Sequence, residues 1–317
     1  MTQPRQGTVA DVGEFGLIEA IQPIFPQGSD VVVGPGDDAA VLKVPSGQVV
    51  VSTDLLVEGR HFRCDWSSGE DIGHKAAAAN LSDINAMGGS ATGMVVGLGL
   101  PGSTPMEWVT ELARGIADEA AITGTSVLGG DVTSSDRIVL SVTVLGVCTT
   151  EPVRRCGARA GDVVAVCGRL GWAAAGFTVL GRGFRSPRAV VEVYRRPEPP
   201  YTAGPQAAEL GATAMIDLSD GLLGDLGHVA AASGMAIDIS SGAFELAEPL
   251  TAVGAALGVD PLGFLLTGGE DYALAATFPP EASLPEEWTV VGRVGEGSGV
   301  TVDGAEYDGP SGHQHFR

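Results

Sequence analysis

The sequence predicts an α/β (α+β) protein built from two domains, on three observations. The chain has 317 residues, 44% of them hydrophobic, which is enough for one large or two ordinary packed domains. Helical and strand patterns are mixed in both halves without strict alternation, as is typical of this class. A segment containing Pro152, Gly157 and Gly161 interrupts these patterns. We therefore expect an N-terminal domain over residues 1–148 and a C-terminal domain over residues 149–317.

In the first half, apolar residues at helical spacing predict a short helix over residues 15–25. Three strands are expected to follow, at residues 31–33, 39–44 and 49–53. An alanine-rich stretch predicts a long helix over residues 70–87, and a strand is expected at 92–100. A helix over residues 105–122 begins with Thr104 as N-cap and Pro105 at the first helical position. The apolar run at 138–147 predicts a further strand.

In the second half, strands and helices again follow one another irregularly. The predicted strands cover residues 163–167, 214–216, 236–239, 272–278, 288–294 and 299–302. The predicted helices cover residues 172–180, 189–194, 202–210, 221–232 and 250–257. No repeat of fixed period is present.

Composition excludes several classes of function. The chain has 18 basic and 39 acidic residues, a net charge of −21, which repels nucleic acid and anionic membranes. We expect neither as a partner, whereas a phosphorylated small molecule can bind where cations bridge the negative charges. The four cysteines lack C-x-x-C spacing, which argues against a disulfide framework or zinc site. Residues 1–16 lack an apolar signal region, so we expect a soluble, cytoplasmic protein.

Aspartates recur in five short motifs that follow or interrupt apolar runs. The motifs read G-P-G-D-D-A-A, V-S-T-D-L-L, N-L-S-D-I-N-A-M-G, L-G-G-D and I-D-L-S-D-G. Carboxylates suit Mg²⁺ or Mn²⁺ better than zinc. For a single motif, turn and cap chemistry explains an Asp beside Gly or Ser equally well. Five such motifs favour a metal–phosphate site, and their presence in both halves suggests a cleft between two domains.

Neither a Walker A loop nor a dinucleotide-binding glycine motif is present, so a bound nucleotide needs another phosphate site. The strand ending at Asp54 presents three successive oxygen ligands, Ser52, Thr53 and Asp54. The glycines before Asp131 permit close approach of the backbone to a phosphate. Ser219 or Asp220 can cap the following helix, whose free amides attract an anion. Arginines 154, 155 and 159 can reach a polyphosphate, although surface arginines in a linker explain them equally well.

In this order, the motifs resemble those of the thiamine-monophosphate kinases. The resemblance runs from residue 13 almost to the C-terminus. Its marks are G-E-F-x-L-I at 13–18, G-D-D-A-A at 36–40, S-T-D at 52–54, G-x-H-F at 59–62, N-L-S-D-I-x-A-M-G at 80–88, G-G-D at 129–131, I-D-L-S-D-G at 216–221 and G-G-E-D-Y at 268–272. The family belongs to a wider group of ATP-using enzymes that includes aminoimidazole ribonucleotide synthetase and selenophosphate synthetase.

The resemblance implies ATP-dependent phosphorylation of thiamine phosphate to thiamine diphosphate, with several Mg²⁺ ions. It also implies a two-domain subunit whose N-terminal halves pair in a homodimer. The implied metal ligands are Asp38, Ser52, Thr53, Asp54, Asp83, Asp131, Asp217 and Asp220, among which Asp54, Asp83 and Asp220 are expected to be catalytic. The implied ATP contacts are Gly130, Asp131, Arg155 and Ser219. Thiamine phosphate is expected to contact His61, Glu270 and His313, the last standing where the family usually has an aromatic residue.

The chemistry is consistent with this reading. The attacking phosphate oxygen is ionised near pH 7, because the second pKa of a phosphate monoester is about 6, so a general base is not required. Positioning and charge neutralisation then carry the transfer. Two alternatives stay open at this point: a sister ATP-dependent synthetase of the same group, and a non-catalytic Mg-nucleotide-binding protein. A Ca²⁺-stabilised structural protein is disfavoured, since the sequence contains no EF-hand loop.

Overall fold

The structure, a computed structural model, describes residues 8–33, 41–44, 47–309 and 312. The chain divides into two compact units, which we describe separately. Unit 1 comprises residues 1–84 and 90–147, and unit 2 comprises residues 85–89 and 148–317. Both units combine sheets with helices, which confirms the predicted α/β (α+β) class.

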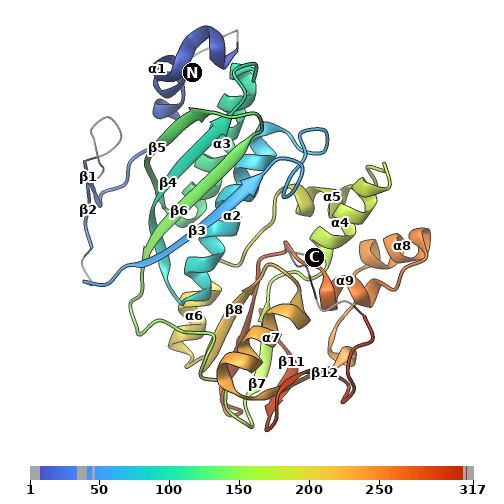
Figure 1. The fold of residues 1–317 in the computed structure, drawn as a ribbon. Coiled ribbons are helices and arrows are strands. Elements are labelled where there is room, and N and C mark those ends of the chain that lie inside the picture. Colours follow the sequence, from blue (N-terminus) through green and yellow to red (C-terminus); the bar gives the residue numbers. More distant parts are fainter. Residues whose placement is uncertain (1–7, 34–40, 45–46, 310–311, 313–317) are drawn as a thin grey trace. The chain divides into compact units, whose positions relative to one another are not determined.

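Unit 1 is built on a four-stranded sheet in the order β3-β6-β4-β5 (Figure 1). The strands are β3 (Val50–Val57), β4 (Ser90–Leu100), β5 (Ser126–Ser134) and β6 (Val139–Val147). Strand β6 is antiparallel to β3 and β4, whereas β4 and β5 are parallel. Helices α2 (Gly69–Ala86) and α3 (Met106–Thr123) cover one face, on which Leu56, Leu140 and Val142 are buried.

The other face of this sheet carries exposed side chains. Alternation along β3 places Val51, Thr53 and Leu55 on it, and Val51 and Leu55 are 57% and 55% exposed. Cross-strand pairing extends the face through Thr143 on β6 to Val95 on β4. An apolar sheet face of this kind is a candidate contact surface.

The N-terminal elements differ from the prediction. Helix α1 (Val9–Ile21) begins six residues earlier than expected and ends in a 3-10 turn, η1 (Gln22–Ile24). Both the amide and the hydroxyl of Thr8 donate to the Asp11 carboxylate, at 2.7 and 2.8 Å, and thereby fix the first turn. Strands β1 (Val31–Val33) and β2 (Val41–Leu42) form a separate antiparallel pair. The predicted strand at 39–44 lies partly outside the described residues.

Unit 2 contains a six-stranded sheet in the order β12-β9-β11-β7-β10-β8. All neighbouring strands are antiparallel except β12 and β9. The strands are β7 (Val163–Cys167), β8 (Ala214–Leu218), β9 (Ala236–Ile239), β10 (Ala273–Phe278), β11 (Trp288–Gly295) and β12 (Gly299–Val302). The helices are α4 (Trp172–Gly181), α5 (Arg188–Arg195), α6 (Ala203–Glu209), α7 (Leu222–Ser233), α8 (Glu248–Leu257) and α9 (Pro261–Thr267), with a 3-10 turn η2 (Ser241–Ala243).

Both faces of this sheet are buried at β7, β8 and β10. Val164 and Val166 on β7 pack in one apolar cluster, which includes Leu222 of α7. Ala165 and Cys167 pack in the other, on the opposite face, with Ala207 of α6. The central strands are therefore almost entirely apolar, which is why the sequence shows them as continuous hydrophobic runs.

No single helix in the described part of the chain is long and apolar enough to cross a membrane. The α8–α9 pair has the length and composition of a span only when both helices are counted together, and it is bent by 113°.

Candidate active site

In unit 1, Ser52, Asp54 and Asp83 come together beside β3. The Ser52 hydroxyl donates a 2.6 Å hydrogen bond to Asp83 Oδ2. The Asp54 amide donates to Asn80 Oδ1 at 2.9 Å. Because side chains alternate along a strand, Ser52 and Asp54 lie on the same face of the sheet, the face that the helices cover. The group thus offers hydroxyl and carboxylate oxygens, which are ligands suited to a hard cation.

Asn80, which is not among the predicted site residues, holds this group in place. Its side chain is completely buried, and its Nδ2 donates to the Ala76 carbonyl at 2.9 Å within α2. Its oxygen accepts the Asp54 amide, so one side chain ties α2 to β3. An asparagine in an otherwise alanine-rich buried helix face was the available sequence signal, because a buried amide requires partners.

The Thr53 hydroxyl lies on the opposite face from Ser52 and Asp54. It donates to the Val142 carbonyl at 3.0 Å and accepts from the Thr143 hydroxyl at 2.9 Å. The three successive side chains that the sequence presented as one ligand set are therefore divided between the two faces of the sheet.

Gly130 and Asp131 do not join this group within the sheet. They lie on β5, at the edge opposite β3, with β6 and β4 between. Asp131 is paired through Gly97 and Ser141 with Leu55, so its side chain lies on the exposed face. Strand β5 continues through both residues, with a bulge where its pairing to β4 shifts register. A Cβ atom on Gly130 would collide with the Val96 carbonyl, so strand packing by itself requires this glycine.

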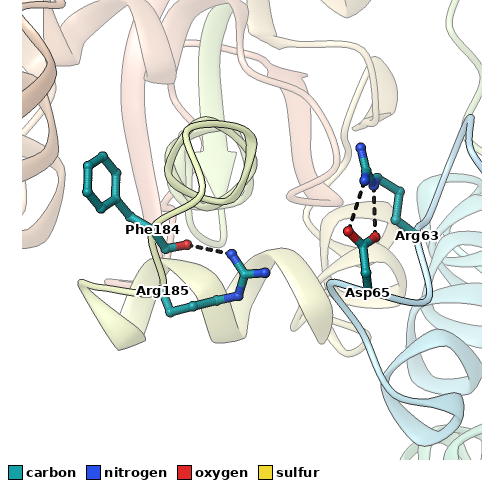
Figure 2. A network of polar contacts seen from close by, with 4 residues as sticks. All are labelled: Arg63, Asp65, Phe184 and Arg185. Atoms are coloured by element: carbon teal, nitrogen blue, oxygen red, sulfur yellow. Dashed lines mark hydrogen bonds and ion pairs between the residues drawn. The ribbon is translucent and has the colours of Figure 1, made fainter.

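His61 lies in the loop between β3 and α2, and one of its ring nitrogens is already bonded. The Val57 amide donates to His61 Nδ1 at 3.0 Å. The neutral ring therefore carries its proton on Nε2, which can donate. The same loop is braced by Arg63, which donates two 2.9 Å hydrogen bonds to Asp65 (Figure 2) and lies 4.6 Å above the Trp66 ring.

In unit 2, the segment from Asp217 to Gly221 connects the end of β8 to the start of α7. Asp217 is buried on β8. The amides of Asp220 and Gly221 both donate to Asp225 Oδ2, at 3.0 and 3.1 Å. Asp225, in the first turn of α7, thus fixes the backbone that carries the Asp220 side chain. Asp225 was not predicted; its sequence signal is an acidic residue in the first turn of α7, where free backbone amides need acceptors.

Glu270 is fastened to the same segment. The Glu270 amide donates to the Ser219 carbonyl at 2.8 Å, and the Tyr272 amide donates to the Leu218 carbonyl at 3.1 Å. Glu270 and Tyr272 both have positive φ angles, 67° and 52°, in a region that residues other than glycine rarely adopt. Such strain concentrates at functional sites, where surrounding contacts maintain it.

Asp271, between these two strained residues, caps helix α4. Its Oδ2 accepts the Gly171 amide at 2.6 Å and its Oδ1 accepts the Ala173 amide at 2.8 Å. Burial raises the pKa of Asp271 to about 7, against the pull of these amides. Burial also raises the pKa of Asp225 to about 7.

The remaining predicted site residues are placed as follows. Arg155 is exposed, and its charge lies near enough to Asp225 to lower the pKa of that carboxyl in part. Arg185, which is not a predicted site residue, lies in the same unit and donates to the Phe184 carbonyl at 3.0 Å (Figure 2). Gly312 lies against the Asp220 backbone, since a Cβ there would approach the Asp220 carbonyl oxygen to 2.7 Å. Asp38 and His313 lie outside the described residues.

Two family models match the chain. The AIR synthase related protein N-terminal domain matches residues 36–148, and the C-terminal domain of the same family matches residues 159–304. Thiamine-monophosphate kinase of Mycobacterium tuberculosis is 45% identical over 98% of this chain and 93% of its own length. That of Corynebacterium glutamicum is 38% identical over 90% of this chain and 87% of its own length.

Solved structures agree with these matches. Thiamine-monophosphate kinase from Stenotrophomonas maltophilia superposes with a TM-score of 0.82 at 31% identity, covering 96% of this chain and all of that one. AaThiL in complex with AMPPCP and TMP has a TM-score of 0.79 at 34% identity, over 96% and 98%. Hydrogenase maturation protein HypE of E. coli, at 21% identity and a TM-score of 0.72, shares the fold. These matches confirm the resemblance predicted from the motifs: the chain belongs to the thiamine-monophosphate kinase family, and it is a kinase.

Proposed function

We propose that this chain transfers the γ-phosphoryl group of ATP to thiamine phosphate, giving thiamine diphosphate and ADP. The observation that carries the proposal is the similarity, over 96% of the chain, to a kinase solved with the ATP analogue AMPPCP and with TMP. The bond between the γ-phosphorus and the β,γ-bridging oxygen of ATP breaks, and its electron pair leaves with ADP. A phosphate oxygen of thiamine phosphate forms the new bond, in line with the leaving oxygen.

The described carboxylates and hydroxyls fit Mg²⁺ by their chemistry, since the cluster of Ser52, Asp54 and Asp83 supplies hard oxygen ligands only. Bound Mg²⁺ would neutralise the charge of the phosphates. We propose as ligands the residues expected from the sequence: Asp38, Ser52, Thr53, Asp54, Asp83, Asp131, Asp217 and Asp220. Because the Thr53 hydroxyl lies on the far face, its ligand atom would be the main-chain carbonyl. One Mg²⁺ takes only one or two carboxylates, so this number of ligands requires several ions.

Substrate contacts follow from the placed residues. His61 Nδ1 accepts the Val57 amide, and Nε2–H is proposed to donate to the phosphate of thiamine phosphate. Glu270 and Ser219 are fastened to each other, so acceptor and nucleotide contacts share one rigid segment of unit 2. We propose Arg155, Gly130 and Asp131 as further ATP contacts, and His313 as a substrate contact. Asp54, Asp83 and Asp220 are the proposed catalytic carboxylates.

A general base is not needed, because the attacking phosphate oxygen is ionised near neutral pH. The task of the side chains is to bring two polyanions into line and to exclude unproductive orientations. Asn80 and Asp225 serve this task as positioning residues, since each holds the backbone of a proposed ligand.

We further propose a homodimer that forms through the exposed face of the unit 1 sheet. Val51 and Leu55 supply its apolar surface, more than half exposed in the single chain. Asp131 lies on the same face, so a second copy seated there would approach a proposed ATP contact. A cytoplasmic location, expected from the sequence, is part of the same proposal.

The proposal is tested by replacing one proposed ligand in each unit. Asp54→Asn and Asp220→Asn should each lower kcat by orders of magnitude and raise the Mg²⁺ concentration for half-maximal rate. The matched control is Asp136→Asn, an exposed aspartate in the β5–β6 connection, which should leave both values unchanged. Circular dichroism checks the fold of each variant. Wild-type kcat and Mg²⁺ dependence in both ligand variants would refute the assignment.

With chirally labelled ATP, inversion at the transferred phosphorus supports in-line transfer and retention excludes it.

A further inference from the structure

A second cluster of potential metal ligands lies in unit 1, between helices α2 and α3. Glu70 and His74 are one turn apart on α2, and Asp118 lies on α3. One ligand atom of each residue lies within 4.8 Å of the other two. None of the three is among the residues proposed for phosphoryl transfer, so the cluster is a separate feature of the molecule.

The His74 ring is oriented by a buried carboxylate. His74 Nδ1 and Glu119 Oε2 are 2.9 Å apart, and the side chains are only 12% and 5% exposed. A hydrogen bond from Nδ1–H to Glu119 leaves the Nε2 lone pair to bind a cation. This carboxylate–histidine pairing is the usual support of a metal-binding histidine, since it fixes the tautomer and makes the ring more basic.

Close helix packing holds the cluster together. A Cβ atom on Gly73 would collide with the Leu112 carbonyl of α3, and one on Gly115 would collide with the Glu70 carbonyl of α2. The two backbones therefore touch beside the cluster, and the ligands belong to rigid helices rather than to loops. Asp118 is exposed, so a bound ion could keep water as a further ligand.

We propose that Glu70, His74 and Asp118 bind a divalent transition-metal ion of the Zn²⁺ class, with Glu119 orienting His74. An imidazole ligand favours such ions over Mg²⁺, which prefers oxygen ligands. With Glu119, the cluster places three carboxylates around one imidazole, and a dication offsets their mutual repulsion. The ion would link the first turns of α2 to α3. Helix α2 also carries Asn80 and Asp83.

The test measures metal binding directly, with the full chain freed of metal by a chelator. Zn²⁺ is titrated against a chromophoric competitor in excess Mg²⁺, which occupies the oxygen-rich kinase ligands. We expect one Zn²⁺ equivalent in the wild type. His74→Gln should no longer bind this Zn²⁺ ion. The matched control His228→Gln, which changes an exposed histidine on α7, should still bind one Zn²⁺ ion per chain. Glu119→Gln should weaken the affinity about 10- to 100-fold.

A second probe reads out the ligands themselves. Co²⁺ in place of Zn²⁺ should give d–d absorption bands in the wild type that His74→Gln removes. Asp118→Asn, a change at an exposed position, should weaken binding without loss of fold, so the test does not depend on the histidine variant alone. No Zn²⁺ bound in excess Mg²⁺, or an unchanged equivalent in both His74→Gln and Asp118→Asn, would overturn the proposal. Asp54→Asn should retain the equivalent, which separates this site from the kinase site.

Discussion

Asp225 and Asp271, two of the buried aspartates of unit 2, should respond oppositely to loss of their charge. Asp225 accepts both of its amide hydrogen bonds on one oxygen, Oδ2. Asp271 accepts one amide on each oxygen, from Gly171 and Ala173. An asparagine has only one acceptor oxygen, and its NH₂ group would point at an amide N–H if it replaced the second. Asp225→Asn can therefore keep both bonds, whereas Asp271→Asn must lose one.

The magnitude follows from this count. In Asp271→Asn, one buried backbone amide at the start of α4 loses its acceptor, which costs about 1–3 kcal/mol. For a unit of this size, each kcal/mol lowers Tm by about 2–4 °C. In Asp225→Asn both amides stay bonded and an ionisable group leaves a buried position, so its Tm should match the wild type or exceed it near neutral pH.

Thermal and urea unfolding measured without nucleotide or Mg²⁺ give the two stabilities. Hydrogen exchange on the peptide containing Gly171 and Ala173 locates the effect, since faster exchange there is expected in Asp271→Asn only. Equal stability losses in the two variants, or a wild-type Tm and exchange rate in Asp271→Asn, would refute the reasoning.

Three further predictions concern pH, strand packing and assembly. The pKa of Asp271 is raised from 3.8 to about 7, so the folded state binds more protons than the unfolded state between these two pH values. The free energy of unfolding should therefore fall as the pH rises from about 4 to about 7. Comparison of urea midpoints over this range should show a smaller fall in Asp271→Asn; equal slopes would contradict it. Gly130→Ala should cost about 1–3 kcal/mol of stability, because the new Cβ meets a neighbouring strand. The control Gly97→Ala should cost less, since the nearest atom to its new Cβ lies at 3.5 Å. Equal Tm values for the two variants would contradict this prediction. Leu55→Glu should give a monomer in light scattering while Ile122→Glu, at an exposed position on α3, leaves the dimer intact; a monomeric wild type would exclude the proposed homodimer.

Strong periodicity made most helices and strands predictable. The buried strand β7 is a continuous apolar run, and the predicted and observed bounds coincide at β7, β9 and β12. Weak periodicity hid others. Helix α9 was missed because it is seven residues long, although Asp260 as N-cap and Pro261 after it mark its start. The capping pair Thr8 and Asp11 likewise marks the true start of α1.

The aspartate motifs predict candidate ligands, but not their geometry. Alternation along a strand separates Thr53 from Ser52 and Asp54, a consequence that the motif S-T-D contains once the strand is known to continue through it. The double glycine before Asp131 permits close approach of the backbone to a phosphate, but the packing of β4 against β5 requires Gly130 in any case.

The sequence holds signals for Asn80 and Asp225, but it does not show which backbone amides the positioning residues hold. Asn80, Asp225 and Asp271 act through backbone amides, and an amide partner leaves no trace in residue type. Their partners lie up to 100 residues away along the chain, as for Asp271 and Gly171, so only the folded arrangement reveals them.

The most direct test of the central claim is product formation by the purified protein. It is incubated with ATP, Mg²⁺ and thiamine phosphate, and both thiamine diphosphate and ADP are quantified, with thiamine and no-acceptor controls. The account predicts equal amounts of thiamine diphosphate and ADP with thiamine phosphate, and neither product with the controls. ADP and free phosphate without thiamine diphosphate would contradict it and point to another acceptor.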